Sequence, residues 1–531
     1  MRSLVHSRFR SLTLYSAILF ACCSPPGLVH AADETFMLHA RSQVETSAGS
    51  GRYHALTKEV RWEPTKTAVI VCDMWNQHWC RGATERVGQM APRMNQVLRA
   101  ARDLGALIIH CPSDTMKFYE NHPQRRVATQ AKPVEGRVKL EPWRSLNLDH
   151  EPALPIDDAD GGCDCDPHCP QGSPWRHQID TLEIMPKDAI TDSAEAYYLL
   201  EERGIDNVIL VGVHTNMCVL GRPFSIRQMV SLGKNVVLMR DMTDTMYCSG
   251  SAPFVNHFTG TDLVVGHIER YWCPTVTSAD LLGGKEFRFP ADHRPTVAML
   301  IGEDEYQTER TLPEFALAKL GRDYRTRFIF ASDTDKNDFP GIEAIDDADV
   351  LLVSVRRRLL TESQLAHVRN FVAAGKPIVG IRTASHAFSM REGDVPAGHE
   401  AWPEFDAEVL GGHYTNHHGN HPPDGPKSFV QIVPEAANSP ILQGFTPGEQ
   451  IVPSWLYMTS PLATGAQVLL TGRVEGVEQP EPVAWTYVPA TGNRVFYTSL
   501  GHPEEFKSPE FRRLLANGIY WAAGKENEGE E

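Results

Sequence analysis

Residues 207–223 read N-V-I-L-V-G-V-H-T-N-M-C-V-L-G-R-P. The run from Asn207 to Val213 is short, apolar and rich in β-branched residues, which is typical of a strand buried on both faces of a parallel sheet. Small and polar residues then lead to a single thiol, Cys218. A turn from this strand into a helix would place backbone N–H groups and a positive dipole end beside the sulfur, and both favour a thiolate. Cys218 is therefore a candidate nucleophile, the alternative being a core cysteine that merely follows a strand.

A second strand of the same kind lies earlier in the chain and ends in an acid. Residues 67–73 read T-A-V-I-V-C-D, so Asp73 stands at the edge where open α/β sheets bind ligands. Capping of the next helix is the alternative role for this carboxylate. Residues 84–104 have helical spacing, with Pro92 as a kink or as the start of the main helix, and residues 106–111 read as a strand. These segments form a β-α-β unit.

Further strands and helices complete the first half. Asp192 to Glu195 reads as a capping box that opens a helix ending at Arg203. Residues 235–240 read as a strand and residues 262–273 as a helix. We therefore expect at least four parallel strands that alternate with helices in a three-layer α/β/α sandwich. The irregular residues 113–180 are expected to shape the mouth of the pocket.

The N-terminus predicts an exported protein. Arg2, Arg8 and Arg10 precede an apolar stretch that is too short to span a bilayer, and a small-residue exit follows at 29–32. We expect a signal peptide over residues 1–32 and a periplasmic or secreted protein, with lipid attachment at Cys22 as the less favoured alternative. No later run is long and apolar enough for a membrane span.

Length and charge restrict the class of partner. The chain has 531 residues, which predicts more than one globular domain, and a net charge of −16 without a long basic cluster. This balance argues against nucleic acid or an anionic membrane surface as partner. A small-molecule substrate is therefore the expected partner. The sequence leaves homo-oligomerisation open.

One loop is crowded with thiols. Residues 161–169 read G-G-C-D-C-D-P-H-C, which places Cys163, Cys165 and Cys169 together. The spacing C-x-C-x-x-x-C is not a standard zinc motif. In an exported chain we prefer a disulfide clasp to a metal site, with the pairing left open.

The motifs of the first half carry a family resemblance. Asp73, Lys187 ahead of the helix before the nucleophile strand, and G-V-H-T-N-M-C-V at 212–219 resemble the isochorismatase-like cysteine hydrolases, which include nicotinamidases and N-carbamoylsarcosine amidases. The resemblance covers roughly residues 60–275. It implies a catalytic triad of Asp73, Lys187 and Cys218. It also implies a cis peptide before His214 and an oxyanion hole of backbone N–H groups near His214 and Cys218.

General chemistry agrees with this triad. A carboxylate can take the proton of the thiol, and a lysine beside both groups would hold the acid ionised. Family members that keep the cysteine generally cleave C–N bonds of amides or ureides, so the resemblance implies this reaction. Nicotinamidases also hold zinc through an Asp-x-His motif, but residues 112–115 read P-S-D-T and supply no such histidine. We expect no metal and no cofactor.

The second half repeats an α/β pattern after a linker rich in Gly and Pro at 273–295. Residues 361–364 (T-E-S-Q) open a predicted helix that ends at Gly375, residues 376–381 read as a strand, and another helix is expected to start at Ser508-Pro509. Residues 482–485 (P-V-A-W), 495–502 (V-F-Y-T-S-L-G-H) and 511–515 (F-R-R-L-L) resemble trehalose-utilisation-type (ThuA-like) domains. These share the flavodoxin-like layout of class I glutamine amidotransferases. We expect an isochorismatase-like domain over 33–290, a ThuA-like domain over 291–525 and an acidic tail over 526–531.

The resemblance also marks a candidate pocket in the second half. Arg382 stands where the amidotransferases carry their cysteine, and no cysteine follows residue 273. His502 and Glu504 resemble the amidotransferase His–Glu pair, but without a thiol they cannot perform that acyl transfer. A Gly/Asn loop at 411–421 holds four histidines, His413 among them, and we expect it to form a pocket edge. Nearby Trp402 and Trp455 make carbohydrate a conceivable ligand.

Three functions compete at this stage. The first is an exported hydrolase that uses Cys218 to cleave a C–N bond. The second is a carbohydrate-binding or scaffolding protein whose hydrolase domain is retired. In the third, the second domain acts on a sugar through His502 and Glu504.

Overall fold

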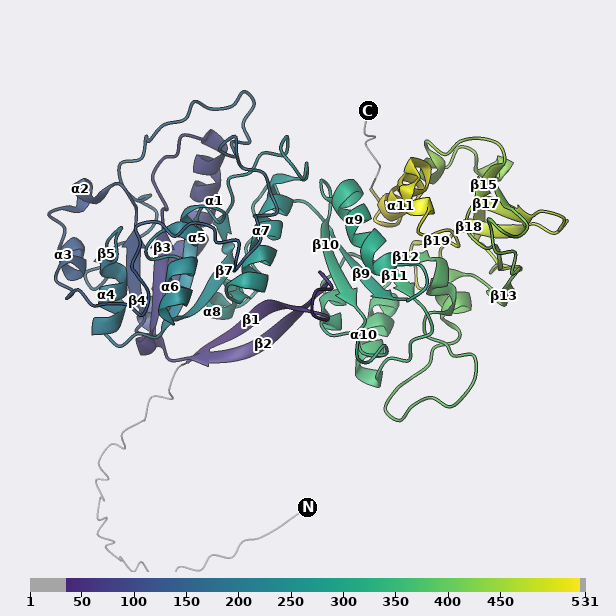
Figure 1. Cartoon of the computed structure of the whole chain (residues 1–531), viewed down its shortest axis with the longest axis horizontal. Helices are drawn as coiled ribbons and strands as arrows, with labels where there is room; N and C mark the ends of the chain where they lie inside the picture. Colours follow the sequence, from purple (N-terminus) through teal and green to yellow (C-terminus); the bar gives the residue numbers. More distant parts are fainter. Residues whose placement is uncertain (1–34, 526–531) are drawn as a thin grey trace, which may run out of the picture. The chain divides into compact units, whose positions relative to one another are not determined.

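The computed structural model describes residues 35–525, and Figure 1 shows their arrangement along the chain. The predicted signal peptide and the acidic tail lie outside these residues. Two large sheets, each with its own hydrophobic clusters, make up the described part. No helix within residues 35–525 has the length and apolar character needed to cross a membrane.

The first sheet has eight strands in the order β2-β1-β8-β7-β6-β3-β4-β5. The strands are β1 Phe36–Glu45, β2 Tyr53–Trp62, β3 Thr67–Cys72, β4 Leu107–Cys111, β5 Ala189–Ile190, β6 Asn207–Val213, β7 Asn235–Asp244 and β8 Thr275–Val276. From β8 to β5 all neighbours are parallel, which confirms the predicted parallel sheet. The β1–β2 hairpin, which the sequence did not reveal, joins this sheet antiparallel through β8.

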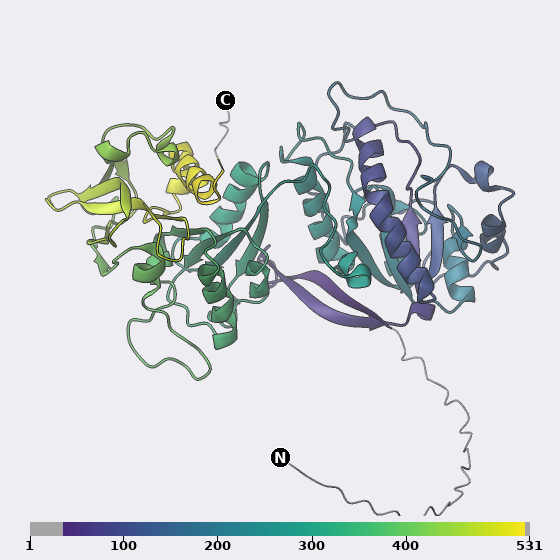
Figure 2. The ribbon, with the colours of Figure 1, turned by 180° about the vertical axis from the view of Figure 1, so that it is seen from behind.

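Helices cover both faces of this sheet. They are α1 Arg81–Asp103, α2 Met116–Tyr119, α3 Pro123–Thr129, α4 Glu195–Glu202, α5 Cys218–Gly221, α6 Ile226–Leu232, α7 His257–Tyr271 and α8 Ala279–Leu282. In β3, Ile70 packs in the cluster that contains α4 and α6, whereas Val69 and Val71 pack against α1. The views from front and back show α6 and α1 on opposite faces (Figures 1 and 2). Strands buried on both sides explain the continuous apolar runs.

One alternative for Pro92 is excluded, and one local prediction was wrong. Helix α1 begins at Arg81 and runs through Pro92, so the proline does not start it. The capping box at 192–195 does not form, because α4 begins at Glu195 and its N-cap is Ala194. The carboxylate of Glu195 instead accepts hydrogen bonds from Arg125 Nη1 at 2.5 Å and Thr191 Oγ1 at 2.7 Å. A guanidinium is a stronger partner than a backbone N–H, and it draws the carboxylate away.

The second sheet has nine strands in the order β10-β9-β11-β12-β19-β18-β17-β14-β15. They are β9 Thr296–Gly302, β10 Arg325–Phe330, β11 Val350–Val355, β12 Ile378–Ile381, β14 Ser428–Ile432, β15 Gln450–Val452, β17 Gln467–Val474, β18 Glu481–Tyr487 and β19 Val495–Thr498. The five strands from β10 to β19 are parallel, and the other four extend the sheet antiparallel. A separate pair joins β13 Asn416–His417 to β16 Tyr457–Met458.

Three helices flank this sheet: α9 Thr308–Leu320, α10 Glu362–Ala373 and α11 Pro509–Ala522. Helices α9 and α11 lie on one face and α10 on the other. The predicted helix starts are confirmed, because the side chains of Thr361 and Ser508 cap α10 and α11. Short helical turns are η1 Pro64–Lys66, η2 Ile342–Ile345, η3 Arg382–His386, η4 Asp406–Leu410, η5 Pro434–Ala436, η6 Pro440–Leu442 and η7 Glu505–Lys507.

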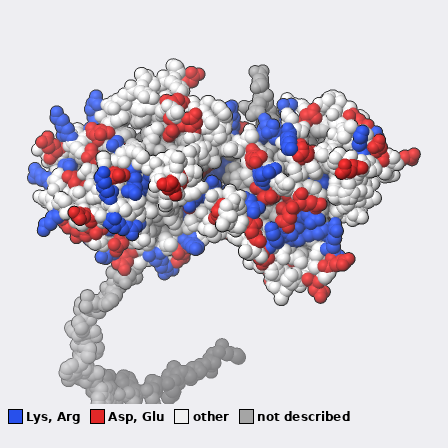
Figure 3. Space-filling model, viewed as in Figure 1, with Lys and Arg blue, Asp and Glu red and all other residues white. Residues whose placement is uncertain are grey.

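The charged side chains are mixed on the surface. On the face drawn in Figure 3, Lys and Arg are interspersed with Asp and Glu. Neighbouring charges of opposite sign largely cancel beyond the screening length, which is about 8 Å at physiological salt.

Candidate functional site

Asp73 lies at the carboxyl edge of the first sheet, directly after β3. Its side chain is buried, and one carboxylate oxygen accepts a hydrogen bond from the backbone N–H of Ser113 at 2.8 Å. Its backbone is left-handed, with φ 45°, which costs a non-glycine residue on the order of 1 kcal/mol. Such conformations concentrate at functional sites, because the surrounding structure must hold them in place.

Cys218 follows the neighbouring strand β6 and is the first residue of α5. Its sulfur lies beside the carboxylate of Asp73, and the two groups influence each other's pKa. The close approach of β6 to β3 depends on Gly212, where a Cβ would lie 2.0 Å from the carbonyl oxygen of Cys72. The predicted cis peptide before His214 is present. The acid and the sulfur of the predicted triad therefore meet.

The cation at this site is Arg222, which the sequence interpretation missed. Its Nε donates to Asp73 at 3.3 Å and its Nη2 to Asp114 at 3.2 Å. The guanidinium also contacts the sulfur of Cys218 and lies 5.8 Å from the ring centre of Trp143. Residues four apart on a helical turn lie on one face, and this spacing between positions 218 and 222 was the available signal.

Lys187 does not take part in this cluster, and the triad is corrected on this point. Lys187 is exposed and lies two residues before β5. Because Ala189 pairs with Ile109 in a parallel ladder, the lysine lies toward the amino ends of the strands. Asp73 and Cys218 lie at the opposite, carboxyl ends. The residue after the lysine, Asp188, is the buried one, and it pairs with Arg102 at 2.9 Å.

The electrostatics favour a protonated sulfur at rest. Burial, followed by the negative charge of Asp73, raises the pKa of Cys218 well above its ordinary value, and Arg222 counteracts this. Burial also raises the pKa of Asp73, and Arg222 again opposes the shift. Helix α5 has only four residues, so its dipole is too short to favour the thiolate as the sequence had suggested. The thiol must therefore lose its proton to a base during the reaction.

The predicted oxyanion donors are the backbone N–H groups at His214 and Cys218. Cys218 opens α5, and the first N–H groups of a helix have no partner within the helix. His214 is buried, and burial lowers the pKa of its ring well below the ordinary value, so the ring is neutral. Its ring lies 4.8 Å from that of His78, whose pKa burial lowers to about 4. The wall next to the nucleophile turn is thus uncharged.

The long loop between β4 and β5 contributes to this region. Trp143 of this loop packs on Gly221 and the backbone N–H of Arg144 donates to the Gly221 carbonyl at 2.7 Å. Farther along, the rings of Trp175 and Trp75 stack at 4.5 Å. A cavity of about 360 Å³ lies between the segment that carries His78 and residues 170–174 of the loop. The loop therefore forms aromatic walls on two sides of the nucleophile turn.

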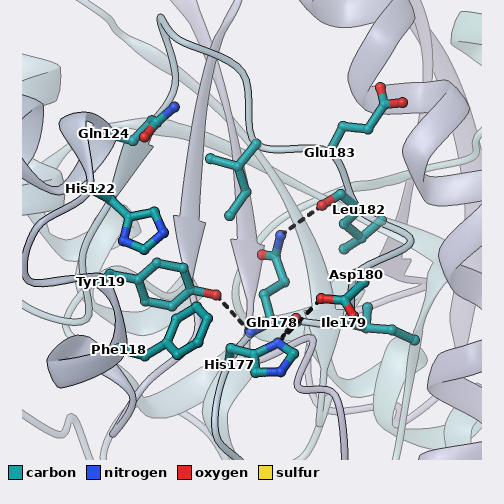
Figure 4. Close-up of a pocket in the computed structure, with 11 residues that line it drawn as sticks. Phe118, Tyr119, His122, Gln124, His177, Gln178, Ile179, Asp180, Leu182 and Glu183 are labelled. Carbon is teal, nitrogen blue, oxygen red and sulfur yellow. Dashed lines mark hydrogen bonds and ion pairs between the residues drawn. The ribbon is translucent and has the colours of Figure 1, made fainter.

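A second cavity of about 280 Å³ lies between α2 and residues 177–184. Figure 4 shows the hydroxyl of Tyr119 and the side chains of His122 and His177 around it. The Tyr119 hydroxyl accepts a hydrogen bond from the backbone N–H of Gln178 at 2.8 Å. None of the candidate catalytic residues lines this cavity, so we assign it no part in the chemistry.

The loop cysteines are not joined in the predicted disulfide clasp. All nine cysteines of the described residues are free thiols. Cys163, Cys165 and Cys169 instead gather with Cys80, whose sulfur lies 3.8 Å from that of Cys165. A disulfide requires about 2.05 Å between the sulfurs, so the sulfurs of Cys80 and Cys165 are close together but not bonded.

In the second half, Arg382 lies directly after β12, as predicted, and is buried in a left-handed conformation with φ 44°. Its Nη1 donates to Ser499 O at 2.8 Å and Ser454 Oγ at 3.1 Å. Its Nε and Nη2 have no hydrogen-bond partner. The guanidinium lies 4.0 Å from the ring centre of Tyr306 and 4.9 Å from that of Tyr457. A buried cation with free donors marks this position as a candidate anion- or hydroxyl-binding group.

Of the other residues predicted for this pocket, His502 lies near the cluster, whereas Glu504 and His413 do not. His502 is partly buried near Tyr306, with ring centres 6.4 Å apart. Glu504 is not part of the cluster, because it forms an ion pair with exposed Lys507 at 2.6 Å. The buried acid is the next residue, Glu505, which accepts the N–H of His502 at 3.0 Å. His413 is exposed, whereas its neighbour Tyr414 stacks on His386 at 4.4 Å.

Asp406 supplies a test of stability in this half. Burial raises the pKa of its carboxyl from 3.8 to about 7. The folded state therefore holds a proton that the unfolded state releases, and this contribution is complete below pH 3.8 and lost as pH rises through about 7. At about 1.4 kcal/mol per pKa unit, the loss is roughly 4 kcal/mol.

We expect Asp406→Asn to raise the free energy of unfolding at pH 8 and to change it little at pH 4. Chemical denaturation of both proteins across this range measures the difference. A stability difference that does not depend on pH would contradict the assignment.

A comparison with protein families agrees with the resemblance in the second half. A family model described as trehalose utilisation, ThuA, matches residues 297–522. A solved ThuA-like protein from Bacteroides uniformis is 18% identical with a TM-score of 0.33, and the match covers 46% of this chain and 98% of that chain. No curated protein matches the sequence.

Solved hydrolases are also similar to the chain. A cysteine hydrolase from Pseudomonas syringae pv. phaseolicola is 20% identical with a TM-score of 0.27, and the match covers 42% of this chain and 94% of that chain. The N-carbamoylsarcosine amidase from Thermoplasma acidophilum is 13% identical with a TM-score of 0.20, covering 34% and 83%. Residues 297–522 thus match the ThuA family, and the similar solved structures include a cysteine hydrolase and an isochorismatase family protein.

Proposed function

We propose that the chain is a hydrolase that cleaves a C–N bond of a small amide or ureide, with Cys218 as the nucleophile. The observation that carries this proposal is the convergence of Asp73, Arg222 and Cys218 at the carboxyl ends of β3 and β6. A structural cysteine needs neither a buried carboxylate nor a guanidinium beside its sulfur. Burying these charges is costly, and a reaction that uses them accounts for their presence.

The reaction follows from the positions of these groups. As the sulfur of Cys218 attacks the carbonyl carbon, Asp73 accepts the thiol proton. The C–N bond then breaks, and the same proton passes from Asp73 to the leaving nitrogen. A thioester on Cys218 remains. Water attacks this thioester while Asp73 accepts a proton from it, and the thiol is restored as the acid product leaves.

Arg222 has two effects in this sequence. Its charge opposes the burial that raises the pKa of Asp73 and so favours the ionised form of the base. It also offsets the negative charge that forms on the sulfur of Cys218. The backbone N–H groups at His214 and Cys218 would stabilise the oxyanion, and removal of one such donor typically costs on the order of 100-fold in rate.

A substrate panel tests the proposed class of reaction. Purified full-length protein is incubated with primary amides, N-carbamoyl compounds and esters, and release of ammonia or amine is measured. We expect turnover of an amide or ureide, and acid quenching should trap an acyl adduct on the peptide that contains Cys218. Adducts at another residue, or turnover of esters alone, would contradict C–N hydrolysis at this thiol.

The second candidate function is carbohydrate binding by the ThuA domain. Arg382 favours it, because its free Nε and Nη2 lie among the rings of Tyr306 and Tyr457. Aromatic faces and charged donors are the groups that hold sugars and sugar acids. Binding to a glycan array that persists in Cys218→Ala protein and disappears in Arg382→Met protein would favour this function over hydrolysis.

A further inference from the structure

Four cysteine side chains from two distant segments meet next to the nucleophile turn. Cys80 is the N-cap residue of α1, and Cys163, Cys165 and Cys169 come from the long loop. The sulfurs of Cys80, Cys163 and Cys165 all lie within 4.8 Å of one another. The sulfur of Cys169 lies next to those of Cys163 and Cys165, but it is not part of this three-sulfur group. Each sulfur therefore has at least two others as neighbours.

Backbone N–H groups point at these sulfurs. The N–H of Gly82 donates to Cys165 Sγ at 3.3 Å and that of Arg81 to Cys169 Sγ at 3.5 Å. The N–H of Cys169 donates to Cys163 Sγ at 3.5 Å. Sulfur accepts hydrogen bonds better as thiolate than as thiol, because the thiolate carries a full negative charge. These three N–H donors would stabilise negative charge on three of the four sulfurs.

The cluster is built into the fold and not left on an open loop. Cys80 and Cys163 are 0% and 1% exposed, and both pack with Ala83 and Met246. Between the loop cysteines, Asp164 pairs with Arg86 of α1 at 2.6 Å, which holds the loop on the helix. Gly162 lies against the carbonyl of Met246 so closely that a Cβ would reach within 2.3 Å of it.

We propose that Cys80, Cys163, Cys165 and Cys169 form a tetrahedral zinc site. Zinc binds four thiolates at about 2.3 Å, which makes the edge of the sulfur tetrahedron about 3.8 Å. The sulfurs of Cys80 and Cys165 lie 3.8 Å apart. Four soft thiolates select zinc over the hard cations Mg²⁺ and Ca²⁺. Four protein ligands leave no open position, so the site is structural.

A metal here would fasten the loop to the wall of the active site. Met217, next to the nucleophile, packs on the same cluster. Asn216 donates to Asp158 at 2.7 Å and to the carbonyl of Met246 at 3.1 Å, which ties the loop to the nucleophile turn. The segment that follows Cys169 lines the 360 Å³ cavity. Zinc would thus keep this wall in place without touching the reacting atoms.

Metal analysis of the full-length protein, purified without chelator, tests the site. We expect one equivalent of zinc by mass spectrometry of the elements, released when an organomercurial titrates the thiols. After exchange, Co²⁺ should give the sulfur-to-metal charge-transfer and ligand-field absorption of a tetrahedral thiolate site. Cys169→Ser and Cys165→Ser should lose most of the bound metal, and their melting temperatures should fall.

Cys218→Ser is the matched control, because Cys218 lies outside the four-sulfur cluster and outside the second group that could hold a metal, Asp160, His168 and Cys248. It should keep one equivalent of zinc. Two disulfides among the four cysteines, seen as a mass four hydrogens lower, would overturn the proposal. So would failure of the reduced protein to take up Zn²⁺ or Co²⁺. Stoichiometric iron in place of zinc would overturn the choice of metal. If a Ser variant fails to fold, the mercurial titration of the unaltered protein still decides.

Discussion

A Cys218→Ser protein is expected to lose about 10⁴-fold or more of its turnover, because removal of the nucleophile leaves only binding and the oxyanion donors. Its binding of substrate should change little, since the side chain remains small and polar. Initial rates on the best substrate of the amide panel give the ratio. Circular dichroism should show an unchanged fold.

Alkylation gives the complementary result on the unaltered protein. Iodoacetamide should abolish turnover in step with labelling of the peptide that contains Cys218, and substrate should protect that peptide. The matched control is Cys248→Ser, which removes another partly exposed thiol and should retain full activity. Full activity in Cys218→Ser protein would end the proposal of a thiol nucleophile and leave the binding function of the ThuA domain.

The second large effect is expected from Arg222→Gln. Loss of the guanidinium lets burial raise the pKa of Asp73 further, and an adjacent cation is worth one to three pKa units. We expect a fall of about 100-fold in kcat/KM near neutral pH. The acidic limb of the pH–rate profile should move to higher pH, because the base must be ionised to accept the thiol proton. Arg222→Lys should recover part of the loss.

Lys187→Gln is the control that separates the two assignments. The lysine is exposed and away from Asp73, so its removal should leave both the rate and the pH profile unchanged. A large loss in Lys187→Gln with little effect in Arg222→Gln would restore the lysine of the original triad. It would also mean that the long loop and β5 rearrange when substrate binds.

The two residues that form the core of the site were predictable because each follows a buried strand. Apolar runs of β-branched residues mark β3 and β6, and in parallel strands the carboxyl ends meet at one edge. Asp73 and Cys218 therefore had to lie close together. Lys187 precedes a strand of only two residues, β5, which gives almost no periodic signal, and its register could not be read.

The four-sulfur cluster could not be predicted from the sequence. Three of its cysteines stand in one loop, and a disulfide clasp was favoured because the chain is expected to be exported and the spacing is not a standard zinc motif. The fourth ligand, Cys80, lies more than 80 residues earlier, at the start of α1. Only the packing of the loop on that helix brings its sulfur within 3.8 Å of Cys165. A ligand set assembled from distant segments has no spacing to recognise.

The sequence by itself determined the two α/β sheets, the helix starts at Thr361 and Ser508, and the pairing of Asp73 with Cys218. These features depend on periodicity, capping and strand direction, which are local or follow from the layout of a parallel sheet. The tertiary structure decided which cation serves the thiol and which acid lies beside Arg382. Those choices depend on the side to which a loop or a single turn directs its side chains, and a shift of one residue exchanges a buried group for an exposed one, as at Glu504 and Glu505.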